Sequence, residues 1–123
     1  MNAQTERLSL FGAAGTIEAV RDAAHVPEGA VPRGVAVIAH PHPLFGGTMD
    51  NKVVQTLARA FVQCGWTAVR FNFRGVGASV GAHDEGRGEL QDLLAVVQQR
   101  CDARILPGLE AMMPDSPLVA LLR

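Results

Sequence analysis

The sequence predicts one α/β domain, in which an N-terminal hairpin precedes a mostly parallel sheet flanked by helices. Strand-like and helix-like patterns alternate along the chain, and this alternation is typical of a sheet with crossover helices. The chain has 123 residues, which is the usual length of one domain. Apolar residues make up 48% of it and charged residues 19%, so it can bury a core. We therefore expect residues 1–123 to form a single domain.

The N-terminal third of the chain predicts a hairpin, a loop and a buried strand. Two short apolar runs, residues 8–10 and 17–20, flank the glycine-bounded turn Gly12–Gly15. Residues 25–34 contain two prolines and two glycines, which indicates a loop. Val35–Ala39 is aliphatic throughout, as expected for a strand that is buried on both faces.

The middle of the chain predicts a helix and a second strand. Residues 51–64 form the predicted helix, with Asp50 as its N-cap and Gly65 as its left-handed C-terminal cap. Its apolar residues at helical spacing are Val54, Leu57, Ala58 and Phe61. Residues 67–73 alternate with period two, which predicts a strand. The two alternating sets are Thr67, Val69, Phe71, Phe73 and Ala68, Arg70, Asn72.

The C-terminal part predicts a loop, a helix and a last strand. Residues 74–88 contain five glycines and indicate a loop, and the second helix begins no earlier than Asp84. The apolar stripe of that helix is Leu90, Leu93, Leu94, Val97 and Cys101. Residues 105–117 are irregular, with three prolines, and Leu118–Leu122 predicts a final strand. Right-handed crossovers would make the last three strands parallel.

The composition excludes several classes of function. A net charge of −1 and scattered basic residues provide no field for nucleic acid or an anionic membrane. The longest aliphatic run, Val35–Ala39, is far shorter than the roughly 20 residues of a membrane span. Residues 1–10 show no signal-peptide pattern. Cys64 and Cys101 stand alone, without metal-ligand spacing, so we expect free thiols and a cytoplasmic protein.

A proline- and glycine-rich run, His40–Thr48, follows the first buried strand at its carboxyl end, where open α/β sheets bind ligands. Such a run can be a rigid connector, but its glycines also let backbone N–H groups approach a developing oxyanion. Prolines cannot donate, which leaves a candidate oxyanion and substrate-binding loop of His42, Leu44, Phe45, Gly46 and Gly47. We favour Leu44 as the donor. The spacing of His40 and His42 could suit a metal ion, but no third ligand is evident, so we expect neither metal nor cofactor.

A second motif, Gly77–Gly81, matches the GxSxG pattern of a nucleophile elbow, with Ser79 as its serine. An elbow serine lies on a sharp turn from strand to helix. Here the predicted strand ends near Phe73 and the helix begins near Asp84, which places Ser79 inside a long loop. We therefore expect that Ser79 is not a nucleophile. The glycine spacing also matches neither a Rossmann nor a Walker phosphate loop.

Four acidic residues lie at or near the start of the second predicted helix. They are Asp84, Glu85, Glu89 and Asp92. Carboxylates gather there because the positive end of the helix dipole favours them, and this explanation outweighs acid–base catalysis. We expect Glu89 and Asp92 to face solvent.

Taken together, HPHPLFGGTMDNKVV and FNFRGVGAS followed by GAHDEGRGE resemble the α/β-hydrolase superfamily. They are most similar to its small bacterial members, which are related to dienelactone hydrolases and serine aminopeptidases. The resemblance covers residues 8–99 and implies that His40–Gly47 is the oxyanion-hole loop. It implies that residues 74–81 follow the next strand without holding the nucleophile. It also implies a later elbow, acid and histidine, whereas the 123 residues end where that elbow would begin.

We therefore expect a hydrolase by ancestry, for small-molecule esters, thioesters or amides. This chain would retain the oxyanion loop, lack the triad and be inactive; a truncated or frame-shifted reading frame would account for that. One alternative is a small active hydrolase that uses Ser79 with His83 or His42. Another is a non-catalytic half-fold that acts through a partner chain or self-associates through its open sheet edge. With that edge open, we expect the chain to be marginally stable, aggregation-prone or dependent on a partner.

Overall fold

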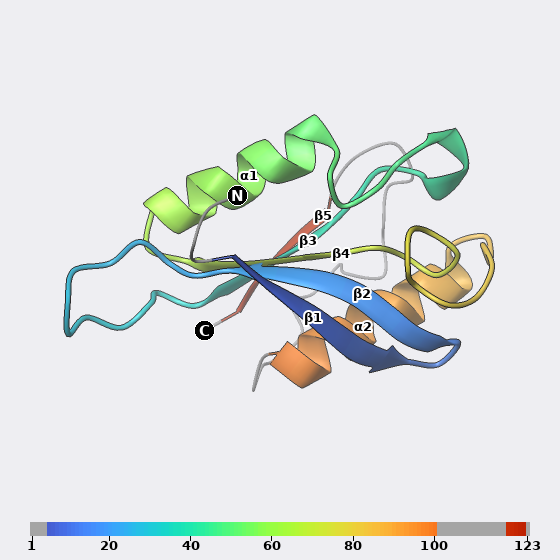
Figure 1. The fold of residues 1–123 in the computed structure, drawn as a ribbon, viewed down its shortest axis with the longest axis horizontal. Coiled ribbons are helices and arrows are strands. Elements are labelled where there is room, and N and C mark those ends of the chain that lie inside the picture. The colour runs from blue at the N-terminus through green and yellow to red at the C-terminus, as the bar shows by residue number, and fades with distance from the viewer. Residues whose placement is uncertain (1–4, 101–117, 123) are drawn as a thin grey trace.

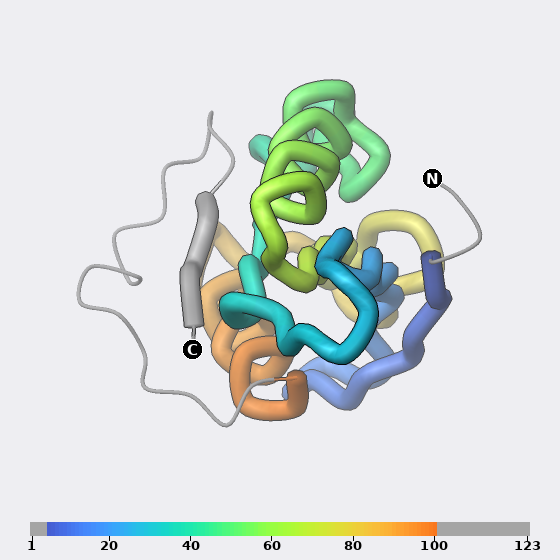
Figure 2. The backbone as a smooth tube through the Cα atoms, turned by 90° about the vertical axis from the view of Figure 1, so that its left-hand side faces the viewer, coloured from blue at the N-terminus to red at the C-terminus, as the bar shows by residue number. Residues whose placement is uncertain are grey.

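A mixed sheet of five strands lies at the centre of the computed structural model, which describes residues 5–100 and, as backbone alone, 118–122. The elements are β1 (Thr5–Gly12), β2 (Gly15–Asp22), β3 (Val35–Ala39), η1 (Pro43–Phe45), α1 (Lys52–Gln63), β4 (Thr67–Phe71), α2 (Arg87–Arg100) and β5 (Leu118–Leu122). Helix α1 covers one face of the sheet and α2 the other (Figures 1 and 2). The predicted α/β class, a hairpin followed by a sheet flanked by helices, is thereby confirmed, although the described sheet is mixed and only its β3–β4 pair is parallel.

The strand order is β1-β2-β4-β3-β5. β1 and β2 form the expected hairpin, with Gly12 opposite Gly15, and β2 continues antiparallel onto β4. β3 and β4 are parallel, as predicted. β5 pairs antiparallel to β3, however, so the expectation of three parallel strands is wrong for the last one. The crossover rule fixes the hand of a parallel connection, but it does not require a connection to be parallel.

β4 is buried along its whole length because helices pack on both of its faces. Alternate residues of β4 face opposite helices, as the period of two predicts. Val69 and Phe71 pack in the core under α2, while Ala68 packs in the core under α1. The strand ends at Phe71, two residues before the predicted end. Cys101 and residues 105–117 lie outside the described residues.

Helix α1 has a different N-cap from the predicted one. The side chain of Asn51 accepts a hydrogen bond from the Val53 N–H at 2.9 Å, so Asn51 is the cap, and not Asp50. Asp50 turns its carboxylate to Arg70, at 3.1 Å. At the other end, Gly65 has a φ of 91°, which confirms the expected left-handed residue after the helix.

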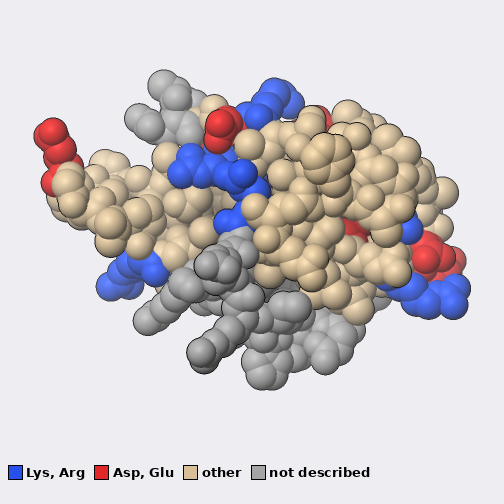
Figure 3. Space-filling model, turned by 90° about the horizontal axis from the view of Figure 1, so that it is seen from below, with Lys and Arg blue, Asp and Glu red and all other residues tan. Residues whose placement is uncertain are grey.

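The surface shows no large patch of one charge on the face seen in Figure 3, where basic and acidic side chains lie in several small groups. This distribution agrees with the net charge of −1. In the described part of the chain, no helix combines the length and the apolar character that a membrane span requires.

Candidate active-site loops

Two loops lie at one end of the sheet, beyond the carboxyl ends of β3 and β4 (Figure 1). His40–Thr48 leaves β3 and contains η1, and residues 72–86 leave β4 and lead into α2. Because β3 and β4 are parallel neighbours, their carboxyl ends lie side by side. The fold therefore brings together the two motifs that the sequence singles out.

His40 joins the two loops directly. Its ring is 3% exposed, and its Nε2 accepts a hydrogen bond from the Phe73 N–H at 3.1 Å. Its Nδ1 donates to the Pro41 carbonyl at 2.7 Å, and its ring meets the Phe73 ring edge-on, with centroids 4.8 Å apart. Burial lowers the pKa of His40 below its ordinary value of 6.5, against the opposing effect of the Pro41 hydrogen bond. The neutral ring therefore holds the start of one loop against the start of the other.

The backbone donors of the His40–Thr48 loop differ in what they bind. The Leu44 N–H donates to Nδ1 of His42 at 3.1 Å, in a solvent-exposed bond. The N–H groups of Phe45 and Gly47 donate to the His42 carbonyl, at 3.1 and 3.3 Å, and that of Gly46 donates to Pro43 at 3.3 Å. Within residues 5–100 and 118–122, the His42 N–H has no acceptor. The favoured donor, Leu44, is thus held by an imidazole that solvent can reach.

The two glycines of this loop serve different needs. Gly46 has a φ of 78°, a left-handed conformation that side chains disfavour, and a Cβ there would meet nothing within 4 Å. A Cβ at Gly47 would instead strike the Pro41 carbonyl and lie 2.8 Å from the His42 oxygen. Gly47 is therefore required by the close approach of two backbone segments.

His42 also touches the second loop. Its ring centroid lies 5.1 Å from that of His83 and 5.0 Å from that of Phe45. Nδ1 of His83 is 3.2 Å from Oε2 of Glu89, which is buried at the start of α2. A histidine and a carboxylate of the second motif thus stand beside the first.

Glu89 and Asp92 are both 1% exposed, so the expectation that they face solvent is wrong. Asp92 accepts from the Arg74 N–H at 2.8 Å and pairs with the Arg74 guanidinium at 3.0 Å. Burial raises the pKa of Glu89, but the N–H groups of Asp84 and Gly86 at 2.9 Å outweigh it and leave that pKa below 4.5. The glycine-rich loop folds back over this face of α2, and the sequence pattern of the helix could not show that.

Ser79 is a structural residue of the second loop. Its hydroxyl donates to the Asn72 carbonyl at 2.6 Å and accepts from the Glu18 N–H at 2.9 Å, and the residue is 5% exposed. Its Oγ thus has a donor and an acceptor in the backbone. No histidine side chain shares a hydrogen bond with it in the described part of the chain. Ser79 lies within the loop between β4 and α2, as its position in the sequence suggests.

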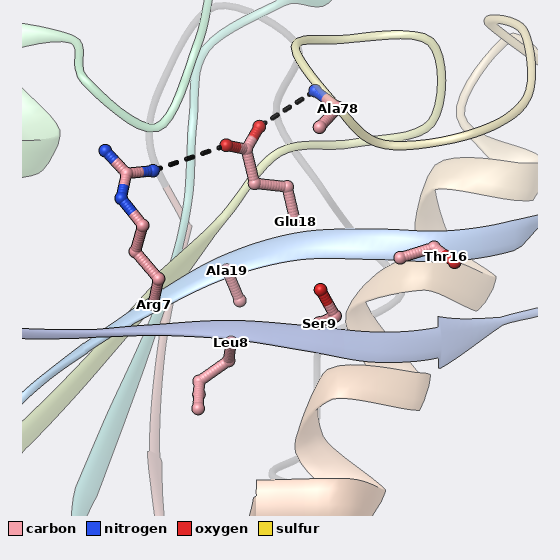
Figure 4. A pocket seen from close by; sticks show the side chains of 7 residues that line it. All are labelled: Arg7, Leu8, Ser9, Thr16, Glu18, Ala19 and Ala78. Carbon is pink, nitrogen blue, oxygen red and sulfur yellow. Dashed lines mark hydrogen bonds and ion pairs between the residues drawn. The ribbon is translucent and has the colours of Figure 1, made fainter.

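No group of three potential metal ligands occurs among residues 5–100 and the backbone of β5. An open pocket lies on the hairpin, where Glu18 is 3.6 Å from Arg7 and accepts from the Ala78 N–H at 2.8 Å (Figure 4). The His40–Thr48 loop does not line this pocket. The candidate site is therefore the loop pair, and the pocket is separate from it.

Sequence reasoning missed Arg70 and Asn72. Both are buried polar residues of the sheet end, with 3% and 4% exposure. The available signal was their spacing, since two polar residues two positions apart on an otherwise apolar strand share one face. That spacing indicates that Arg70 and Asn72 bind polar groups on the same face of the sheet, but it does not identify those groups.

Comparison with known proteins supports a serine hydrolase fold. No family model matches the chain. The chain is 50% identical over 58 residues to the uncharacterized protein RP471 of Rickettsia prowazekii, which corresponds to 47% of the chain and 24% of the relative. It is also similar to XC6422 of Xanthomonas campestris, an α/β serine hydrolase without a lid. That structure has a TM-score of 0.72 and 41% identity over 80% of this chain and 45% of its own length.

An α/β serine hydrolase homologue from Coxiella burnetii gives a TM-score of 0.68 and 45% identity, again over 80% of this chain and 45% of the other. The chain thus spans less than half the length of these two proteins and about a quarter of its curated relative. In sequence and in fold, the chain is therefore similar to part of the α/β serine hydrolase fold.

Proposed function

We propose that the His40–Gly47 loop is the oxyanion-binding part of an acyl-transfer site for small-molecule esters, thioesters or amides. The observation that carries the proposal is the position of the loop. It leaves the carboxyl end of β3 and is held by His40 against the loop that follows the parallel strand β4. Backbone N–H groups at such a place can stabilise the negative charge of a tetrahedral intermediate.

The donors in this proposal are the N–H groups of His42 and Leu44. The first has no acceptor within residues 5–100 and 118–122. The second binds the half-buried imidazole of His42, so a substrate oxygen would have to replace that ring nitrogen. Glycines at 46 and 47 let the loop turn back on itself, with the Gly46 N–H on the Pro43 carbonyl and the Gly47 N–H on the His42 carbonyl.

The 123 residues alone do not hydrolyse such substrates in this proposal. Acyl transfer of this type needs a nucleophile, a base and a group that orients the base. The Ser79 hydroxyl is bound to backbone groups on both sides. No histidine follows His83 in the sequence, so these residues contain no Ser–acid–His order after α2. The exposed thiol of Cys64 supports a reducing compartment such as the cytoplasm.

An anion titration tests the loop. Phenylphosphonate, a mimic of the tetrahedral oxyanion, is added to the ¹⁵N-labelled chain, and the amide shifts of residues 42–47 are expected to move. Leu44→Pro removes one N–H and should weaken the response, while Leu44→Ala keeps the N–H and serves as the matched control. Shifts elsewhere, or an equal response of both variants, would refute the assignment.

A hydrolysis assay tests the missing nucleophile. The chain should not turn over p-nitrophenyl acetate above the rate of a heat-unfolded sample, and a fluorophosphonate probe should label no serine. Ser79→Ala should leave both results unchanged while lowering the free energy of unfolding by about 1–3 kcal/mol, because the Glu18 N–H loses its acceptor. Ser9→Ala, at an exposed position, controls for the stability change. Labelling of Ser79 would instead favour a small active hydrolase.

A further inference from the structure

Two buried polar residues, Arg70 on β4 and Asn72 just after its end, hold the backbone that follows the His40–Thr48 loop. Arg70 and Asn72 lie two positions apart and so share the face of the sheet that carries α1. Both side chains reach Met49, which follows the loop and is itself 3% exposed. The polar groups of these side chains are thus used where α1 is about to begin.

The peptide groups on the two sides of Met49 are held separately. The Met49 N–H donates to Oδ1 of Asn72 at 2.8 Å. The Met49 carbonyl accepts from Nη1 of Arg70 at 3.0 Å, and the same nitrogen is 3.1 Å from the carboxylate of Asp50. Three contacts from two side chains therefore fix one residue of backbone and its neighbour.

The side chains of Arg70 and Asn72 are themselves bound to residues of β2. Nε of Arg70 is 3.4 Å from Asp22, a carboxylate on β2 that is 3% exposed. Nδ2 of Asn72 donates to Oε1 of Glu18 at 2.8 Å. A Cβ at Gly77 would lie 2.6 Å from both Nδ2 of Asn72 and Oε1 of Glu18, so the second loop also closes over this bond. The chain of contacts runs from β2 through β4 to the loop.

We propose that Arg70 and Asn72 are positioning residues that set where the oxyanion loop ends, by fixing both peptide groups of Met49 against β2. The role rests on the proposed function of that loop. It also follows from the cost of the arrangement. A buried ion pair is often no more stable than well-packed apolar side chains, so a contribution to position explains Arg70 and Asp22 better than stability does.

A direct measurement on the unaltered chain tests the first half of the grip. In ¹³C,¹⁵N-labelled protein, scalar coupling across the hydrogen bond should connect the Met49 amide nitrogen with the side-chain carbonyl carbon of Asn72. The Met49 amide should also exchange slowly with solvent. Absence of the coupling together with fast exchange would overturn the proposal without any variant.

Two substitutions at one position separate positioning from packing. Asn72→Leu keeps a side chain branched at Cγ but removes the acceptor, and the Met49 amide should then exchange at least about tenfold faster relative to global unfolding. Asn72→Asp keeps an acceptor and should retain most of the protection. Val69→Ala, on the opposite face of β4, is the matched control because it destabilises the core without touching the loop. Equal exchange in Asn72→Leu and Val69→Ala would contradict the role.

The second half of the grip has its own pair of variants. Arg70→Met should shift the amide resonances of residues 42–50, and Arg70→Lys should restore part of their wild-type positions by returning one cationic donor. If neither variant moves these resonances while both lower stability, Arg70 is merely structural. If phenylphosphonate does not shift the amide resonances of the unaltered chain, the proposed function fails. The scalar coupling and the exchange rate of the Met49 amide still decide whether Asn72 and Arg70 fix Met49.

Discussion

Polar side chains buried at the loop end of the sheet are held in defined hydrogen bonds. His40 bridges two loops as a neutral ring, Ser79 ties its loop to β2, and Asn72 reaches Met49. A buried polar group without a partner costs free energy, so each of these residues depends on a specific neighbour. These side chains accordingly hold the loops in place, even where the sequence motif around them resembles a catalytic one.

The pH dependence of stability should report on His40. Its pKa is lowered in the folded chain, so the unfolded chain binds a proton more readily. The contribution of His40 to the free energy of unfolding is therefore complete above the ordinary value of 6.5. It is lost as the pH falls from 6.5 through the folded-state pKa. Urea unfolding between pH 8 and pH 5 measures this loss.

The free energy of unfolding of His40→Gln at pH 8 should be about 1–3 kcal/mol lower, because one of the two hydrogen bonds of the ring is lost. It should also show a smaller decline between pH 7 and pH 5. His25→Gln, at an exposed position, should keep the full decline. A decline of the same size in His40→Gln would show that other groups cause it. Glu89 adds a second loss at lower pH, since its pKa lies below 4.5.

At the scale of elements, the His40–Thr48 loop is shaped by its neighbours as much as by its own residues. η1 turns the chain tightly, His40 fixes its start to Phe73, and Asn72 fixes Met49 just after its end. The loop is thus attached on both sides to the end of β4. Such attachment is what a preorganised set of N–H donors requires.

Alanine substitutions at Gly46 and Gly47 should distinguish the cost of a left-handed backbone from the cost of a steric clash. Gly46→Ala should cost only about 1 kcal/mol, from the left-handed backbone. Gly47→Ala should cost about 1–3 kcal/mol and shift the amide resonances of residues 41–47, because its Cβ meets the rigid Pro41 carbonyl. Urea unfolding and amide spectra measure both effects. The assignment of Gly47 fails if the two variants behave alike.

At the scale of the whole molecule, the described sheet has two edges, β1 and β5. β1 carries exposed charged residues, Glu6 and Arg7, and such charges discourage pairing with another strand. β5 lies beside β3 at the other edge. We propose that any self-association of this chain uses the β5 edge.

Light scattering after size exclusion should show a mass that rises between micromolar and submillimolar concentrations. Amides of residues 118–122 should then gain protection from exchange at the high concentration, while those of β1 should not. The β1 amides serve as the internal control, since both sets belong to the same sheet. A constant monomer mass would refute self-association. Protection confined to the β1 amides would show that self-association uses the β1 edge and not the β5 edge.

Patterns with a short period could be predicted well from the sequence. The hairpin, β3, α1 and β4 follow from local alternation and from turn residues, and the structure confirms each of them. Ser79 lies in a loop, as predicted, since the number of residues between Phe73 and the next helix leaves no sharp turn. The errors concern Asp50, Glu89 and Asp92, whose environments depend on segments that lie far away in the sequence.

Local sequence patterns alone predict the α/β class, the succession of the first four strands along the chain, and the two loops that follow β3 and β4. These features depend on local backbone preferences and on the period of apolar residues, and both signals lie within a single segment of the chain. Tertiary structure decided the direction of β5, the burial of Glu89 and Asp92, and the grip of Arg70 and Asn72 on Met49. A buried polar group is satisfied by whichever partner the folded chain brings near, and that partner is not written in its own segment.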